Sequence, residues 1–205
     1  LLMNWKRTQI SVNTNIIYFS ALRWLTKILM SAPKQQDADN AAMDTRWKPN
    51  VTVAAIIEKE GLYLLIEEHT QEGLRLNNPA GHLDPGESPA QGCARETLEE
   101  TARPFTPKEL VGIYLSRFQR PQTGEDITYV RMAFCGDIGD VQPGLSLDEG
   151  IVRTVWMTPQ EVRESAERHR SPLVLRCIED HLAGQRFPLG VIHTDAAVAE
   201  LPPLQ

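Results

Sequence analysis

The sequence predicts a mixed α/β (α+β) fold in which helices pack on a mixed β-sheet. Apolar residues alternate with polar ones in several short segments, a pattern typical of half-buried strands. Three stretches begin with a capping residue followed by proline, which is typical of helix starts. The chain has 205 residues, 41% of them hydrophobic and 23% charged, ordinary values for one globular domain with terminal tails.

The predicted strands begin at residue 50. Apolar side chains alternate over residues 51–57, and Glu60 and Gly61 form a turn, so residues 62–66 are expected to return as the second half of a hairpin. Further strands are expected at residues 74–78, 110–118, 126–138 and 151–157. A glycine- and proline-rich loop at residues 79–87 precedes the first helix.

Three helices are predicted from their N-terminal caps. The caps are Ser88, Thr158 and Ser171, and each is followed by a proline that suits the first helical position. Glu161 has the spacing that completes a capping box with Thr158. The first helix runs to Ala102, and Gly184 is expected to end the third.

The domain is expected to cover residues 46–195. Residues 1–45 are expected to be an N-terminal extension, disordered or non-native, and residues 196–205 a C-terminal tail. The most apolar run, at residues 15–30, is interrupted by basic residues and is shorter than the roughly 20 residues that span a bilayer, so no membrane association is expected.

Charge and cysteine usage restrict the partners. The net charge is −6, and residues 1–33 contribute +4, so the remainder carries −10. Such an acidic body argues against stable nucleic acid binding, and an anionic substrate would need metal ions or local arginines. The three cysteines are widely spaced and form no zinc motif, which suits the reducing cytoplasm. A monomer or homodimer is expected.

The first helix carries an acidic face. Glu96, Glu99 and Glu100 stand at positions i, i+3 and i+4, so their carboxylates share one side of the helix. Like charges at this spacing destabilise a helix by about 0.2–0.5 kcal/mol per pair. A divalent cation removes this repulsion, and oxygen ligands are those that Mg²⁺ prefers.

Other residues stand at fixed spacings from this face. Gly81 is followed after five residues by Glu87, and after seven more by Arg95 and Glu96. Arg95 can pair with a helix carboxylate or with Glu87 and so hold the acidic groups in place. The whole set lies on a loop that leads into a helix.

This segment resembles the Nudix box, the signature of Nudix hydrolases. The resemblance implies a Nudix-type α/β/α sandwich and hydrolysis of diphosphate linkages in small phosphorylated substrates. It also implies a Mg²⁺ site, for which Mn²⁺ can substitute, with ligands at Gly81, Glu96, Glu99 and Glu100. Glu87 would then support the site and Arg95 would orient carboxylates. Thr97, Ala102 and Arg103 depart from the usual pattern, at positions that serve helix packing and termination.

The general base has two candidate positions. A carboxylate must remove a proton from the attacking water, and Glu96, Glu99 and Glu100 are candidates on the helix. Some Nudix enzymes take a base or metal ligand from a downstream segment, which corresponds to Asp148 and Glu149, so Glu149 is a second candidate. The alternative for this pair is a solvated turn.

Two longer segments, at residues 78–88 and 170–189, resemble the NudJ-type phosphatase branch of the family. That branch is associated with nucleoside di- and triphosphates and with thiamine-type pyrophosphates, and with release of inorganic phosphate. The alternatives are a housecleaning pyrophosphohydrolase that releases pyrophosphate, and a non-catalytic Nudix module that binds nucleotide. The non-catalytic module is disfavoured because every box glutamate is present.

Substrate contacts are expected from basic and aromatic residues near the box or on the two long strands. The candidates for phosphate binding are His82, Arg117 and Arg131, and Arg120 and Tyr129 lie beside them. A structural hydrogen bond for His82, and an exposed strand charge or a core aromatic side chain for the others, are the competing interpretations.

Overall fold

The computed structural model describes residues 47–120 and 123–200. Their elements belong to one compact unit, Pro49–Gln205. The expected N-terminal extension, residues 1–45, lies outside the described residues, and the expected tail contains a short helix, α6 (Ala197–Glu200). In the described part of the chain, no helix is long and apolar enough to cross a membrane.

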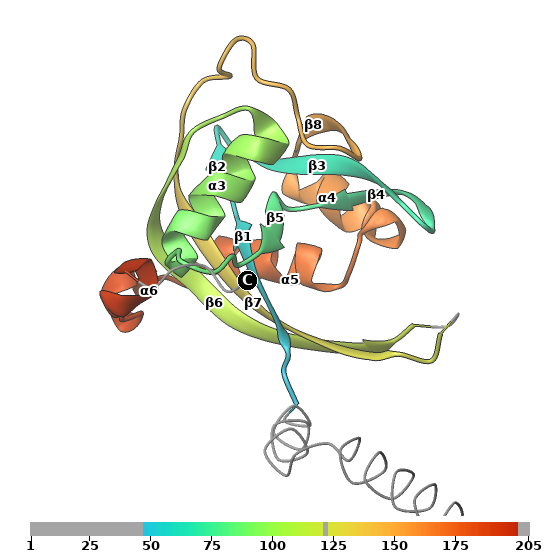
Figure 1. The fold of residues 1–205 in the computed structure, drawn as a ribbon. Coiled ribbons are helices and arrows are strands. Elements are labelled where there is room, and N and C mark those ends of the chain that lie inside the picture. The colour runs from blue at the N-terminus through green and yellow to red at the C-terminus, as the bar shows by residue number, and fades with distance from the viewer. Residues whose placement is uncertain (1–46, 121–122, 201–205) are drawn as a thin grey trace, which may run out of the picture. The chain divides into compact units, whose positions relative to one another are not determined.

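A five-stranded mixed sheet forms the centre of the fold, in the order β5-β1-β7-β6-β9 (Figure 1). Its strands are β1 (Asn50–Ala55), β5 (Ala80–His82), β6 (Phe105–Gln119), β7 (Asp126–Ile138) and β9 (Phe187–Pro188). Strand β1 runs parallel to β7, and the other neighbours are antiparallel. The predicted α/β class with a mixed sheet is therefore confirmed.

A second sheet, entirely antiparallel, packs beside the first. It contains β2 (Glu58–Lys59), β3 (Leu62–Thr70), β4 (Gly73–Asn77) and β8 (Ile151–Met157). The expected hairpin between residues 51–57 and 62–66 was wrong in its first strand: the strand that pairs with β3 at this turn is β2, not β1. The turn at Glu60 and Gly61 exists, but β3 returns along β2, because both edges of β1 are already paired with β5 and β7.

Within the described residues, the three longer helices are α3 (Pro89–Thr101), α4 (Pro159–Glu164) and α5 (Leu173–Leu182). Short 3-10 helices cover Ala166–Arg168 and Leu189–Val191. Capping boxes at Ser88 and Thr158 confirm two predicted starts. The third was wrong: the N-cap of α5 is Pro172, without a side-chain cap bond. Gly184 follows α5 with a φ of +81°, as its predicted role as a helix terminator requires.

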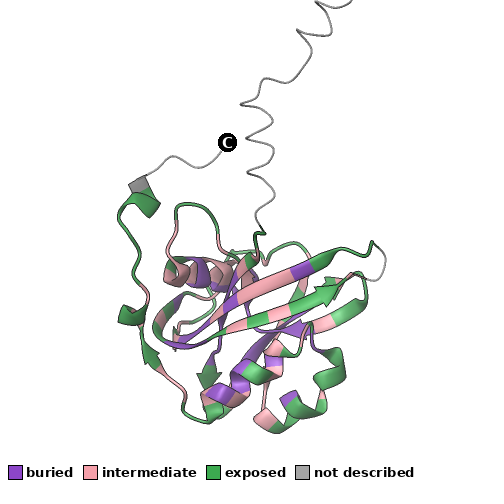
Figure 2. Ribbon diagram, turned by 90° about the horizontal axis from the view of Figure 1, so that it is seen from below, coloured by how far each residue is buried: buried purple, intermediate pink, exposed green. Residues whose placement is uncertain are grey.

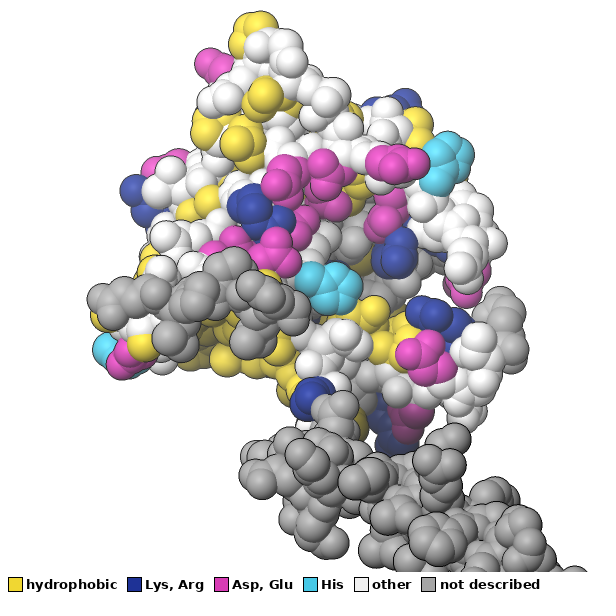
Figure 3. Space-filling view, in the orientation of Figure 1, with side chains coloured by type: hydrophobic (Ala, Val, Ile, Leu, Met, Phe, Trp, Pro, Cys, Tyr) yellow, Lys and Arg dark blue, Asp and Glu magenta, His cyan; other side chains and the backbone are white. Residues whose placement is uncertain are grey.

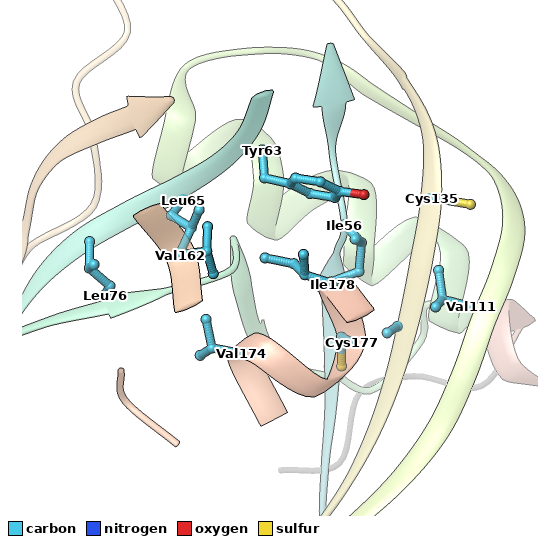
Figure 4. Close-up of a cluster of buried hydrophobic side chains, with 11 residues drawn as sticks. Ile56, Tyr63, Leu65, Leu76, Val111, Cys135, Val162, Val174, Cys177 and Ile178 are labelled. Carbon is cyan, nitrogen blue, oxygen red and sulfur yellow. The ribbon is translucent and has the colours of Figure 1, made fainter. Parts of the chain in front are cut away.

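Two apolar layers hold the helices on opposite faces of the central sheet. Cys93 of α3 packs with Val53 and Phe134, whereas Val174 and Ile178 of α5 belong to a cluster with residues of both sheets (Figure 4). Figure 2 shows the buried residues concentrated on α3, α5 and the strands between them. This is the predicted helix–sheet–helix layering, and it brings the start of α3 next to the edge strand β5.

Two predicted boundaries differ from the observed ones. The loop expected at residues 79–87 contains the strand β5, whose three residues are too few to show a periodic pattern. Strand β6 begins at Phe105, five residues before the predicted start, because Pro107 and the bulges beside it interrupt the alternation. The N-terminal half of β6 is thereby paired with β7.

Candidate active site

Helix α3 presents Glu96 and Glu99 to a single cationic group. The Nη1 atom of Arg95 donates to Glu96 Oε1 at 2.8 Å and to Glu99 Oε2 at 2.9 Å. Two carboxylates on one face of a helix repel each other, so their approach requires a positive charge between them. In this structure the arginine supplies that charge.

The other edge of Arg95 connects the helix to the loop before it. Its Nε and Nη2 atoms donate to the two oxygens of Glu87 at 3.0 and 2.8 Å, and Nη2 also donates to the His82 carbonyl at 3.0 Å. This bidentate contact lowers the pKa of Glu87 and raises the pKa of Arg95. Arg95 therefore makes both of the contacts that the sequence suggested as alternatives.

Two glycines permit the close approach of these groups. A Cβ atom on Gly81 would lie 2.0 Å from Glu96 Oε2, and one on Gly92 would lie 2.6 Å from Glu87 Oε1. Real side chains do not come this close, so any larger residue at Gly81 would have to displace Glu96. The backbone of β5 is thus in direct contact with the acidic face of α3.

Glu100 is the most enclosed carboxylate of the site. It is 8% exposed, and its Oε2 atom accepts the Ala80 N–H at 2.7 Å. Burial, opposed by this bond and reinforced by the neighbouring charges of Glu96, Glu68 and Asp148, raises its pKa to about 8. Burial also raises the pKa of Glu96, against the effect of Arg95. The site therefore contains two carboxyl groups whose ionised forms are disfavoured, chiefly by burial.

This donor set fits a divalent cation in its chemistry. Carboxylate oxygens of Glu96 and Glu99 converge on one positive charge, and carboxylate oxygens are ligands that hard divalent cations prefer. No three acidic, histidine or cysteine side chains among the described residues are already gathered closely enough to hold a metal ion. Arg95 lies between Glu96 and Glu99, and Glu100 is turned toward Ala80.

The downstream acidic pair reaches the site through its first member. The Asp148 N–H donates to the Glu99 carbonyl at 3.1 Å, and the Asp148 charge raises the pKa values of both Glu96 and Glu100. Glu149 is exposed in the turn that precedes β8. The structure thus brings Asp148 to the acidic face of α3, and the patch of acidic side chains is visible in Figure 3.

The three predicted phosphate-binding residues occupy different environments. His82 is exposed at the end of β5, with its carbonyl bound to Arg95. Arg131 is buried: its guanidinium donates to the Asn77 and Asn78 side chains at 3.4 and 3.5 Å, and burial lowers its pKa. The opposing charges of Glu100 and Glu68 act against that shift. Arg131 is therefore close to the acidic cluster.

Arg117 is not brought to the same place. It pairs with Asp126 across the β6–β7 hairpin, and its side chain is 72% exposed. Tyr114 is opposite Arg131 and shares its face of the sheet. Arg117 is three residues further along the same strand, so its side chain points to the other face.

Sequence reasoning missed Glu68 as a member of this environment. Its carboxylate accepts the Asn77 side-chain amide at 3.1 Å and Arg170 at 2.8 Å, and its charge contributes to the raised pKa of Glu100. Glu68 lies on β3 beyond the predicted end of that strand. The adjacent acids Glu67 and Glu68 at the end of an apolar run were the available signal.

The sequence matches the NUDIX domain family over residues 47–177. The chain belongs to the Nudix family and is a hydrolase that acts on pyrophosphate bonds in small phosphorylated substrates. Enzymes of this family generally use divalent metals.

Individual relatives agree with this assignment. Phosphatase NudJ of Escherichia coli (strain K12) is 32% identical over 146 residues, which cover 71% of this chain and 92% of that protein. The solved structure of a NUDIX hydrolase from Nitrosomonas europaea is 47% identical to this chain and superposes with a TM-score of 0.66. The match covers 72% of this chain and 98% of that one. The ORF135 protein of E. coli is 25% identical, covers 66% of this chain and 90% of its own, and has a TM-score of 0.53.

Proposed function

We propose that this enzyme hydrolyses phosphoanhydride bonds in nucleoside di- and triphosphates and thiamine-type pyrophosphates in the cytoplasm, with Mg²⁺ as cofactor and release of inorganic phosphate. The observation that carries the proposal is the convergence of Glu96 and Glu99 on one cationic atom, with the enclosed Glu100 beside them. The similarity to a protein named Phosphatase NudJ supports phosphate as the product.

Glu96, Glu99 and Glu100, with the Gly81 backbone beside Glu96, would hold the cation. When bound there, a divalent cation neutralises phosphate charge and lowers the pKa of a bound water. A diphosphate carries negative oxygens that repel the attacking water, so the acidic cluster requires this positive charge before the substrate can approach. Mn²⁺ has the same preference for oxygen ligands and is expected to substitute.

Arg95 and Glu87 act as positioning residues. Their bidentate contact anchors the guanidinium on the loop side, while Nη1 remains directed at Glu96 and Glu99. The carboxylates are thereby fixed at the junction of β5 and α3. Among the predicted substrate contacts, His82 is exposed at this junction and is proposed to meet the substrate.

The proton of the attacking water passes to a carboxylate of this cluster. A general base is most effective when its pKa lies near the working pH, and burial moves the pKa values of Glu96 and Glu100 in that direction. The Asp148–Glu149 turn provides the second position, with Asp148 placed against α3. Single substitutions at these positions, compared across pH, distinguish the two.

Glutamine substitutions test the assignment of the helix glutamates. Glu99→Gln and Glu100→Gln keep the shape of each side chain and remove its charge. Phosphate release with Mg²⁺ is expected to fall by a factor on the order of 10² or more for each variant. Circular dichroism is expected to show unchanged folding. Glu72→Gln, at a side chain that is 67% exposed, is the control and is expected to keep full activity. Normal turnover by the two site variants would refute the proposed roles.

The product distinguishes the phosphatase from a housecleaning pyrophosphohydrolase. Nucleoside di- and triphosphates and thiamine pyrophosphate are incubated with the enzyme and Mg²⁺, with and without an added inorganic pyrophosphatase. We expect free phosphate without the auxiliary enzyme. Phosphate that appears only in its presence would identify pyrophosphate as the product and overturn the phosphatase assignment.

A further inference from the structure

Three ring-bearing side chains form a continuous row beside the acidic cluster. The rings of Phe118 and Tyr129 are stacked, with centroids 6.1 Å apart and planes 10° apart. The His82 ring lies 6.0 Å from that of Tyr129 at an angle of 49°. We call Phe118, Tyr129 and His82 the aromatic shelf.

The shelf begins at the phosphate end of the site. His82 directly follows Gly81, which abuts Glu96, and the His82 carbonyl accepts a bond from Arg95. Figure 3 shows a histidine side chain next to the acidic patch, with hydrophobic side chains near it. A molecule whose phosphates reach Glu96 therefore extends over the shelf when its remainder crosses the sheet from β5 toward β7 and β6.

Strand geometry places the shelf on the same side of the sheet as Arg131. Thr52 of β1 is opposite both His82 and Arg131, and Tyr129 is two residues from Arg131, so these side chains share one face. Ser116 of β6 is opposite Tyr129 and shares its face, and Phe118, two residues further along β6, lies on that face too. The acidic cluster adjoins β5 at the edge of this sheet, where Glu100 Oε2 accepts the Ala80 N–H and Gly81 contacts Glu96.

The shelf is open to solvent. Phe118 is 47% exposed, His82 is exposed and Tyr129 is half-buried. The solvent-exposed ring faces of this row offer a stacking surface to another planar ring, such as a nucleic acid base. A linear phosphate chain has no planar ring that could stack on this surface.

We propose that the aromatic shelf binds the planar heteroaromatic ring of the substrate and selects ring-bearing phosphates over polyphosphates that lack a ring. This inference rests on the proposed function and adds to it a subsite for the part of the substrate that does not react. Phe118, at the outer end of the row, is the specificity-determining residue, and His82 adjoins the phosphates.

The test compares a nucleoside triphosphate with inorganic tripolyphosphate. In Phe118→Ala, kcat/KM for the nucleotide is expected to fall about tenfold or more, the loss that corresponds to one stacked ring. The value for tripolyphosphate is expected to stay unchanged. Phe118→Trp, which keeps an aromatic ring, is expected to retain the nucleotide kcat/KM that Phe118→Ala loses. The fluorescence of the added tryptophan should be quenched by the nucleotide and not by tripolyphosphate.

Leu115→Ala is the matched control, because Leu115 is 68% exposed on the same strand and points to the opposite face. It is expected to leave both kcat/KM values unchanged. Equal losses on both substrates in Phe118→Ala, or no loss on either, would overturn the shelf while leaving the hydrolase intact. Absence of hydrolysis of every phosphate compound by the unaltered enzyme would instead reject the proposed function, and the shelf with it.

Discussion

At the scale of single residues, the ionisation of Glu100 is costly, because burial raises the pKa of its carboxyl group to about 8. Its carboxylate is enclosed among other acids, and the bond from the Ala80 N–H only partly offsets the loss of water. A protein without a use for this arrangement gains stability by replacing it with a neutral side chain. The proposed cation site would account for this cost, because a bound cation would stabilise the ionised carboxylate.

The cost at Glu100 predicts a pH-dependent stability in the absence of metal. Its pKa is about 8 in the folded protein and near the ordinary value of 4.5 in the unfolded chain. Between these values the folded state keeps a proton that the unfolded state has lost. The stabilisation is therefore complete below about pH 4.5 and is lost as the pH rises through 8, by an amount on the order of a few kcal/mol.

Urea denaturation in the presence of a chelator measures this effect. The free energy of unfolding is determined at several pH values from 5 to 9 for the unaltered protein and for Glu100→Gln. The variant cannot titrate at this position, so its stability should decline less over the range. Identical pH dependence of the free energy of unfolding in the two proteins would show that the pKa of Glu100 is not raised in the folded state.

The residue positions of the box and the candidate partners of Arg95 could be read from the sequence, but the groups around Glu100 could not. Helical spacing is local, so three glutamates on one face follow directly from their positions. The Ala80 N–H, Glu68 and Asp148 approach Glu100 from separate segments of the chain. Arg95 was expected to choose one partner, but its planar fork serves Glu87, Glu96 and Glu99 together.

At the scale of secondary structure, the site is a contact between one strand and one helix. Strand β5 has only three residues, yet its backbone sets the position of Glu96 and supplies the bond to Glu100. The helix begins at a capping box and ends at Ala102, which adopts the left-handed conformation with a φ of +53°. Alanine here takes a backbone conformation for which glycine is the usual choice, so the departure from the box pattern leaves helix termination intact.

Gly81→Ala tests the strand–helix contact. The added methyl group would lie 2.0 Å from Glu96 Oε2, so the carboxylate must move away from its place beside β5. We expect kcat/KM to fall at least tenfold, because misplacement of a reacting group by about 1 Å can cost 10²-fold. Gly190→Ala is the control, since a methyl group there meets nothing within 4 Å. Full activity of Gly81→Ala would argue against a role for Glu96 at this position.

At the scale of the whole molecule, the two sheets and the helices meet around Arg131. This residue belongs to the central sheet, and its guanidinium donates to Asn77 and Asn78 at the end of β4. Burial of an arginine without a direct carboxylate partner is costly. Its positive charge acts on Glu100 and Glu68, so the core supplies a field that favours the ionised form of the acidic cluster.

Arg131→Met is expected to separate this electrostatic role from packing. Loss of the charge should raise the pKa of Glu100 further, so that the acidic limb of the pH–kcat/KM profile moves to higher pH and activity at neutral pH falls by about tenfold. Arg117→Met removes the exposed arginine of the same hairpin, whose pair with Asp126 contributes little stability, and should leave the profile unchanged. A profile of Arg131→Met that matches the unaltered enzyme would assign Arg131 to packing alone.

By itself, the sequence determined the features that depend on near neighbours along the chain. These are the acidic face of α3, the caps at Ser88 and Thr158, and the Nudix box that identifies the hydrolase. Tertiary structure alone decided how β1 and β3 separate into two sheets, and which distant groups surround Glu100. The physical reason is that a helix satisfies its hydrogen bonds within a few residues, whereas strands and buried charges take partners from anywhere in the chain.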